Sequence, residues 1–146
     1  WITADHGQVP LDPARQVELG EAPEVLREML RPLAGDRRGG YLTARPGRRE
    51  ALREALAARL PPGTKLLEME TAIRAGLWGP PPFHPEMADR LGDLLALPPA
   101  PAGLLQRYPA SGPRTRSLRG GHGGLTPEEL LVPLVAGQLD ELSAPG

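Results

Sequence analysis

Proline and glycine divide this chain into short segments. The 146 residues include 19 prolines and 18 glycines, which cluster between the apolar runs. Proline cannot continue a helix interior, and glycine accepts backbone angles that other residues avoid, so such clusters end helices and strands. We therefore predict several short helices and strands that are joined by turns.

The apolar spacing within the segments predicts alternating strands and helices. Strands are predicted over residues 1–4, 40–44, 64–67, 94–97, 104–108 and 130–136. Helices are predicted over residues 24–31, 48–60, 69–75 and 85–90, and from 126, where Thr126, Pro127 and Glu129 form a capping box. Surface loops or turns are predicted over residues 8–22, 35–40 and 109–119, with a frayed end at 143–146. This order predicts an α/β fold with two layers.

Charge and composition exclude several classes of function. Lys and Arg total 17 against 18 Asp and Glu, so the net charge of −1 argues against a nucleic-acid polymer as partner. There is no cysteine, which excludes disulfides and thiolate metal sites. No apolar run reaches the ~18 residues of a membrane span. We expect no membrane partner and a cytoplasmic location. Because Trp1 directly precedes a strand, we also expect a piece of a longer parent, with processing or trimming as the alternative.

Two stretches carry the residues that could bind a metal. Asp5 and His6 follow the first predicted strand, where α/β sheets bind their ligands, and offer one oxygen and one nitrogen. Gly7 would let the backbone turn through a positive φ, so that both side chains reach one ion. His122 lies between two pairs of glycines, which allow close approach of a ligand. Each stretch alone is a weak signal: the alternative for Asp5 and His6 is a strand-end turn with a surface histidine, and the alternative for His122 is a flexible glycine-rich loop.

Taken together, the two stretches resemble a known superfamily. Thr3-Ala4-Asp5-His6-Gly7 and Gly121-His122-Gly123-Gly124, with Thr126-Pro127-Glu128-Glu129 and Val132-Pro133 behind them, resemble the alkaline phosphatase superfamily in its type I phosphodiesterase and nucleotide pyrophosphatase branch. The middle of the chain is similar to the insert of bacterial members at residues 75–79, 84–86 and 90–93.

This resemblance covers nearly the whole chain, but only the C-terminal part of a family enzyme. It implies the C-terminal part of an alkaline phosphatase-like α/β/α sandwich. Residues 1–39 and 109–146 would belong to the metal-binding core, and residues 40–108 would form a small α/β insert or cap.

The resemblance also implies a cofactor and a substrate class. Two divalent ions, zinc or alternatively manganese, would clamp the phosphate of a phosphate ester or nucleotide. Asp5 and His6 would bind the ion that also holds the nucleophile, and His122 would bind the other. Arg119 and His84 are weaker candidates for substrate binding, with a solvated loop and a helix-entry residue as the respective alternatives.

The chain departs from the family pattern in ways that limit its activity. The family needs a Thr or Ser nucleophile at a helix start, and an Asp and a His four residues apart. No Asp in this chain is followed by a His four positions later, and no nucleophile motif is present. We therefore predict that the chain alone is inert and that its partner is the N-terminal remainder of a parent enzyme. The first strand would then lack sheet neighbours and leave apolar edges exposed.

Two alternatives remain open at this point. One is a non-catalytic fragment or a binding and assembly module that keeps the fold. The other is a mononuclear iron oxygenase with two His and one carboxylate, although an Asp directly before a His suits that facial arrangement poorly.

Overall fold

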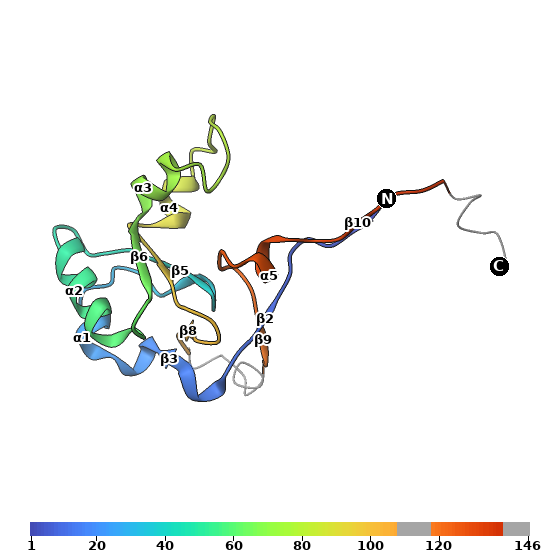
Figure 1. Ribbon diagram of the computed structural model, residues 1–146. Helices are drawn as coiled ribbons and strands as arrows, with labels where there is room; N and C mark the ends of the chain where they lie inside the picture. Colours follow the sequence, from blue (N-terminus) through green and yellow to red (C-terminus); the bar gives the residue numbers. More distant parts are fainter. Residues whose placement is uncertain (108–117, 139–146) are drawn as a thin grey trace.

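A four-stranded antiparallel sheet lies at the centre of the part of the chain that the structure describes, residues 1–107 and 118–138 (Figure 1). The protein is represented by a computed structural model. The strands lie in the order β4 (Ala34–Asp36), β5 (Gly39–Leu42), β7 (Leu94–Leu97) and β6 (Lys65–Glu68). The mixture of helices and strands confirms the predicted class.

One face of this sheet packs against two helices. These are α1 (Pro23–Leu26) and α2 (Arg49–Arg59), which lie together in Figure 1. The predicted apolar stripe of α2 is confirmed, because Leu52 and Leu56 are fully buried against this face. Leu94 and Ala96 of β7 belong to the same core.

The opposite face packs against two further helices, α3 (Met69–Arg74) and α4 (Met87–Leu91). Neighbouring residues of a strand point to opposite faces, so Leu95 and Leu97 join this second core while Leu94 and Ala96 join the first. Helices thus cover both faces of the sheet, so the prediction of two layers was wrong. All four residues are buried, and β7 therefore reads as a continuous apolar run.

Residues 8–22 do not form a surface loop, so that prediction was wrong. This stretch contains two strands and two 3₁₀ helices: β2 (Val9–Pro10), η1 (Pro13–Arg15), β3 (Gln16–Glu18) and η2 (Leu19–Glu21). The strands form because they find distant partners. β2 pairs with β9 (Gly120–Gly121), and β3 pairs in parallel with β8 (Gly103–Leu105), which is shorter than predicted.

Residues 24–31 and 35–40 also differ from the sequence prediction. The helix ends at Leu26, because the Leu30 N–H donates to the carbonyl of Thr43 and draws the chain into an extended path. Residues 35–40 form the tip of the β4–β5 hairpin, and Arg38 within it is 2% exposed. The predicted turn is present at residues 37 and 38, but residues 38–40 are buried, whereas residues 35 and 36 are exposed.

The prediction of a buried strand over residues 130–136 was wrong as well. Helix α5 (Pro127–Leu130) starts with the predicted capping box, and a short strand follows it, β10 (Leu134–Val135). β10 pairs only with β1 (Ile2–Thr3) among the described residues, and this ribbon projects from the body (Figure 1). Leu131 and Leu134 are 75% and 63% exposed, which agrees with the expected exposed apolar edge.

The remaining predicted elements follow the sequence closely. The strands over residues 40–44, 64–67 and 94–97 and the helices over 48–60, 69–75 and 85–90 appear as β5, β6, β7, α2, α3 and α4. The predictions for residues 109–117 and 143–146 lie outside the described part. The division into a core and an insert at residue 40 stays a prediction, and that boundary falls within β5. No helix in residues 1–107 or 118–138 is long and apolar enough to cross a membrane.

A buried ion pair fastens the β4–β5 hairpin to α5. The Arg38 Nε and Nη2 atoms lie 3.2 and 3.3 Å from the two carboxylate oxygens of Glu129. The Arg38 Nη1 also donates to the carbonyls of Pro98 and Ala102, at 2.6 and 2.8 Å. Both charged side chains are at most 2% exposed, and the hydrogen bonds offset the cost of their desolvation.

Replacing Arg38 by Ala is expected to lower the free energy of unfolding by about 3–5 kcal/mol, because it leaves the Glu129 carboxylate buried without a counter-charge. Urea denaturation followed by circular dichroism measures this change. Arg31→Ala is the matched control, since the Arg31–Asp89 pair is exposed and should cost at most about 1 kcal/mol. Equal effects of the two substitutions would contradict the anchoring role of Arg38.

Candidate metal centre

The β2–β9 ladder brings the two predicted site stretches together. Val9 pairs with Gly121, and the Leu11 N–H donates to the carbonyl of Arg119 at 2.8 Å. On the other side of the site, the Gly7 N–H donates to the carbonyl of Glu129 at 3.0 Å. Asp5 and His6 therefore lie beside the loop that carries His122.

The imidazole rings of His6 and His122 stack on each other. Their centroids are 3.7 Å apart and their planes differ by 20°. The side chains are each 34% exposed, so both rings lie at the protein surface. The predicted meeting of these two residues, which are distant in the sequence, is thus observed.

Backbone contacts orient the His6 ring. Its Nδ1 lies 2.8 Å from the carbonyl oxygen of Gly7 and, when it carries the proton, donates to that oxygen. Its Nε2 then keeps a free lone pair and lies 3.6 Å from Oδ2 of Asp5. The other carboxylate oxygen of Asp5 accepts the His6 backbone N–H at 3.0 Å, and the Asp5 side chain is 87% exposed.

A residue that the sequence did not indicate approaches His122. Oδ2 of Asp36 lies 3.8 Å from Nδ1 of His122. Asp36 ends β4, and the hairpin carries it to the His122 loop. The glycines around it, at positions 35, 39 and 40, were the available signal, since such a group indicates close backbone contacts.

Glycines are required at this site chiefly because backbones approach closely. A Cβ atom on Gly7 would lie 1.9 Å from the carbonyl oxygen of Glu128. The predicted positive φ at Gly7 was wrong, because the positive-φ glycines do not include it. Gly123, beside His122, does adopt a positive φ of 94°, as the predicted unusual loop geometry requires.

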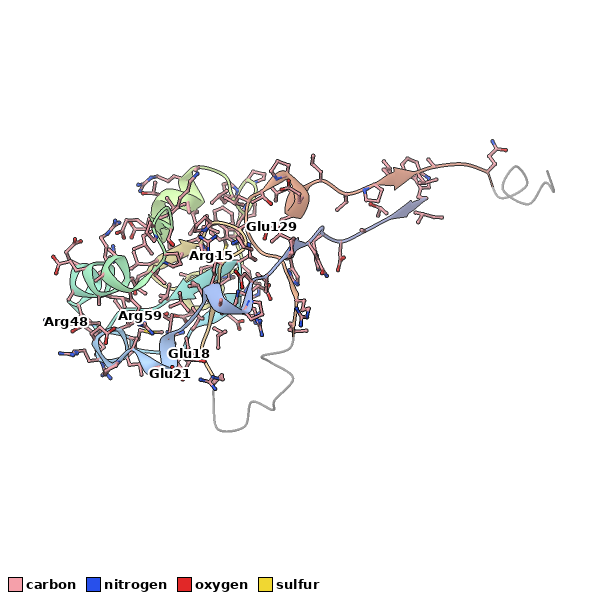
Figure 2. The ribbon with its side chains drawn as sticks, turned by 60° about the horizontal axis from the view of Figure 1, so that its bottom comes forward. Arg15, Glu18, Glu21, Arg48, Arg59 and Glu129 are labelled. Carbon is pink, nitrogen blue, oxygen red and sulfur yellow. The ribbon has the colours of Figure 1, made fainter. Side chains whose placement is uncertain are left out.

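Glu129 anchors the loop that carries His122 through hydrogen bonds. Its carboxylate accepts the Gly124 N–H at 2.9 Å and the Thr126 hydroxyl at 3.0 Å, in addition to the Arg38 guanidinium. Figure 2 shows Glu129 on α5, where the projecting ribbon joins the body. Burial alone would raise the pKa of Glu129, but the hydrogen bonds from Arg38 and Gly124 outweigh it and lower this pKa. The loop is therefore fixed by a carboxylate that stays ionised.

The two weaker candidates lie in different places. Arg119 directly precedes β9 and has an exposed side chain, so it is close to the His122 loop along the chain. His84 is exposed between α3 and α4, a segment that Figure 1 shows well separated from β2 and β9. The His84 carbonyl accepts the N–H of Met87 at the start of α4, which agrees with a helix-entry role.

The donor atoms fit a zinc or manganese ion in kind, as imidazole nitrogens and carboxylate oxygens. Within residues 1–107 and 118–138, however, no three His, Asp or Glu side chains are arranged to hold a single ion. Imidazole lone pairs lie in the ring planes, so two nearly parallel rings direct their lone pairs along separate planes.

Comparison with solved structures identifies a similar fold. Human ectonucleotide pyrophosphatase/phosphodiesterase 5 matches 88% of this chain with a TM-score of 0.60 and 20% sequence identity. The murine protein of the same name matches 89% of the chain with a TM-score of 0.60 and 19% identity. The chain spans only 30% and 31% of these two structures. No protein-family model and no curated protein sequence matches the chain.

The stability of the fold should fall in acid. The pKa of Glu129 is lowered in the folded state below the ordinary value of 4.5, so its stabilising effect is complete above that value. The effect is lost as the pH falls through the lowered folded-state pKa. Glu18 also has a lowered pKa: its burial acts to raise the value, but bonds from Arg107 outweigh it.

Urea midpoints measured between about pH 7 and pH 3 test this expectation. The wild-type midpoint should decline below about pH 4.5, and Glu129→Gln should show a shallower decline from a lower starting value, because it has one carboxylate fewer to protonate. Identical slopes for the two proteins would show that Glu129 is not ionised in the fold.

Proposed function

We propose that this chain is the C-terminal portion of a metal-dependent phosphoric ester hydrolase of the alkaline phosphatase superfamily, similar to nucleotide pyrophosphatases and phosphodiesterases. It would supply Asp5, His6 and His122 to a two-metal site, while the nucleophile lies outside this chain. The substrate would be a phosphate ester or a nucleotide. The cytoplasmic location expected from the sequence stays a prediction.

The observation that carries this proposal is the contact between His6 and His122, which the β2–β9 ladder brings together from distant parts of the sequence. The rings of His6 and His122 are 3.7 Å apart and nearly parallel. Two rings in this arrangement suit two neighbouring ions better than one shared ion, which agrees with the separate assignment of Asp5 and His6 to one ion and His122 to the other.

The residues of this chain would orient the ligand atoms and offset the positive charge of the bound ions. With its proton on Nδ1, His6 would donate to the Gly7 carbonyl and keep Nε2 available as a ligand atom. Asp5 adds a negative charge beside it, which favours a divalent cation. Bound divalent ions supply Lewis acidity and a hydroxide at neutral pH.

The fold comparison supports a partial enzyme rather than a complete one. Both solved phosphodiesterase structures are matched over nearly the whole of this chain but over less than a third of their own length. The exposed apolar residues of the β1–β10 ribbon also favour contact with further protein. The N-terminal remainder of a parent enzyme would provide the missing ligands and the nucleophile.

A second candidate is a non-catalytic module that keeps the fold for binding or assembly. The observation that favours it is the lack of a three-donor group within residues 1–107 and 118–138. The same exposed ribbon would serve assembly equally well. Metal binding separates the two candidates, because a module without metal has no need of the His6–His122 pair.

Zinc titration of the 146-residue chain by isothermal calorimetry tests the metal assignment. We expect His6→Ala and His122→Ala each to weaken zinc binding by more than about 10-fold, because a lost ligand costs at least as much as a lost outer-shell partner. His84→Ala is the matched control and should leave the affinity unchanged, since His84 lies between α3 and α4. Absence of zinc and manganese binding, or equal effects of all three substitutions, would refute the metal centre.

The zinc-loaded chain alone is expected not to hydrolyse bis-p-nitrophenyl phosphate, because it lacks the nucleophile motif. A spectrophotometric assay with buffer and free zinc as blanks measures this. Hydrolysis that His6→Ala abolishes would show that the chain carries a complete site, contrary to the proposal.

A further inference from the structure

We propose that Asp36 is a positioning residue for His122: it holds the Nδ1 proton of the ring and directs Nε2 outward as the ligand atom. The metal that Nε2 would bind rests on the proposed function above. The positioning itself is a property of this chain and can be measured without metal.

The Asp36 carboxylate lies within ion-pair distance of the His122 ring. Oδ2 of Asp36 lies 3.8 Å from Nδ1 of His122. This distance is longer than a hydrogen bond, so the proposed bond requires the carboxylate, which is 59% exposed, to turn toward the ring. A carboxylate at one imidazole nitrogen fixes the tautomer and the orientation of a metal-binding histidine.

Close backbone packing holds Asp36 in this place. Asp36 pairs with Gly39 across the hairpin, and a Cβ atom on Gly39 would lie 2.2 Å from the carbonyl oxygen of Gly123. A Cβ atom on Gly123 would in turn lie 2.9 Å from Cβ of Asp36. The hairpin tip therefore lies directly against the residue that follows His122.

The buried anchor at the hairpin tip adds to this packing. Arg38, two residues after Asp36, is fixed by its bonds to Glu129, and Glu129 also binds the Gly124 N–H. One ion pair thus ties both the strand end that carries Asp36 and the loop that carries His122. This shared support sets the separation of the two backbones that carry Asp36 and His122.

The two rings of the site would then be held in the same manner. His6 has the Gly7 carbonyl at its Nδ1, and His122 has the Asp36 carboxylate at its Nδ1. In each ring, Nε2 would then carry the lone pair that can bind a metal ion. The two lone pairs would lie in nearly parallel planes. Asp36 would also add negative charge to the site without being a ligand itself.

Histidine tautomers measured by long-range ¹H–¹⁵N NMR in the metal-free chain test the proposal. At about pH 8.5, where imidazole is ordinarily neutral, His122 should carry its proton on Nδ1. Asp36→Ala should shift His122 toward the Nε2–H tautomer that predominates in free imidazole side chains, and Asp36→Asn should restore part of the Nδ1–H form, because its amide oxygen accepts the same bond. Asp89→Ala, which removes an exposed acid on α4, is the matched control and should change nothing.

Zinc affinity of the same variants gives the second readout. Asp36→Ala should weaken binding by about 10–100-fold, and Asp89→Ala should not. If Asp36→Ala weakens zinc binding but leaves the metal-free tautomer unchanged, Asp36 is a ligand and the positioning role is refuted. If the tautomer changes but the wild-type chain binds no zinc, the positioning role stands and the proposed metal site fails. A wild-type His122 protonated on Nε2 would overturn the proposal directly.

Discussion

The buried ion pair between Arg38 and Glu129 is the constraint on which the candidate site depends. A buried guanidinium is stable only when its N–H groups find partners, and Arg38 finds two carboxylate oxygens and two carbonyls. The same carboxylate binds the Gly124 N–H and caps α5 through Thr126. One charged group, the Glu129 carboxylate, therefore bonds to the hairpin, the glycine loop and the start of the helix. Loss of Glu129 would remove all of these bonds, whereas loss of Arg38 would remove only those of the hairpin.

The fold was predictable from the sequence wherever local interactions decide the structure. The capping box at Thr126 lies within one turn of chain, and the stripe of α2 repeats at helical spacing, so both were predicted correctly. The structure of residues 8–22 was not predicted correctly, because β2 and β3 pair with strands far along the sequence, β9 and β8. The sequence also could not show whether the apolar run over residues 130–136 is buried. Burial depends on which other residues pack against this run, and an apolar pattern alone does not identify them.

The candidate site was predictable in its motif residues but not in its supporting contacts. Asp5, His6 and His122 stand out because acids and imidazoles beside glycines are typical of ligand sites, and His6 and His122 do meet. Glu129 was recognised as a capping residue, but its bond to Arg38 spans 91 positions and leaves no local pattern. Asp36 was missed although glycines surround it, because its contact with His122 joins two distant parts of the chain. Its proposed role depends on the packing of the β4–β5 hairpin against the His122 loop, which the sequence does not reveal.

The site combines a rigid support with an open face, and this contrast bears on its affinity. The Arg38–Glu129 anchor is almost inaccessible, whereas Asp5 and Asp36 are 87% and 59% exposed. Charges in contact with water attract an ion weakly, because solvent screens them. The ribbon that continues from Asp5 exposes apolar residues such as Ile2 and Leu134, so protein that covers the ribbon would also shield the neighbouring donors. Assembly on the ribbon would thereby strengthen the field at His6 and His122, and cation affinity and assembly should be thermodynamically coupled.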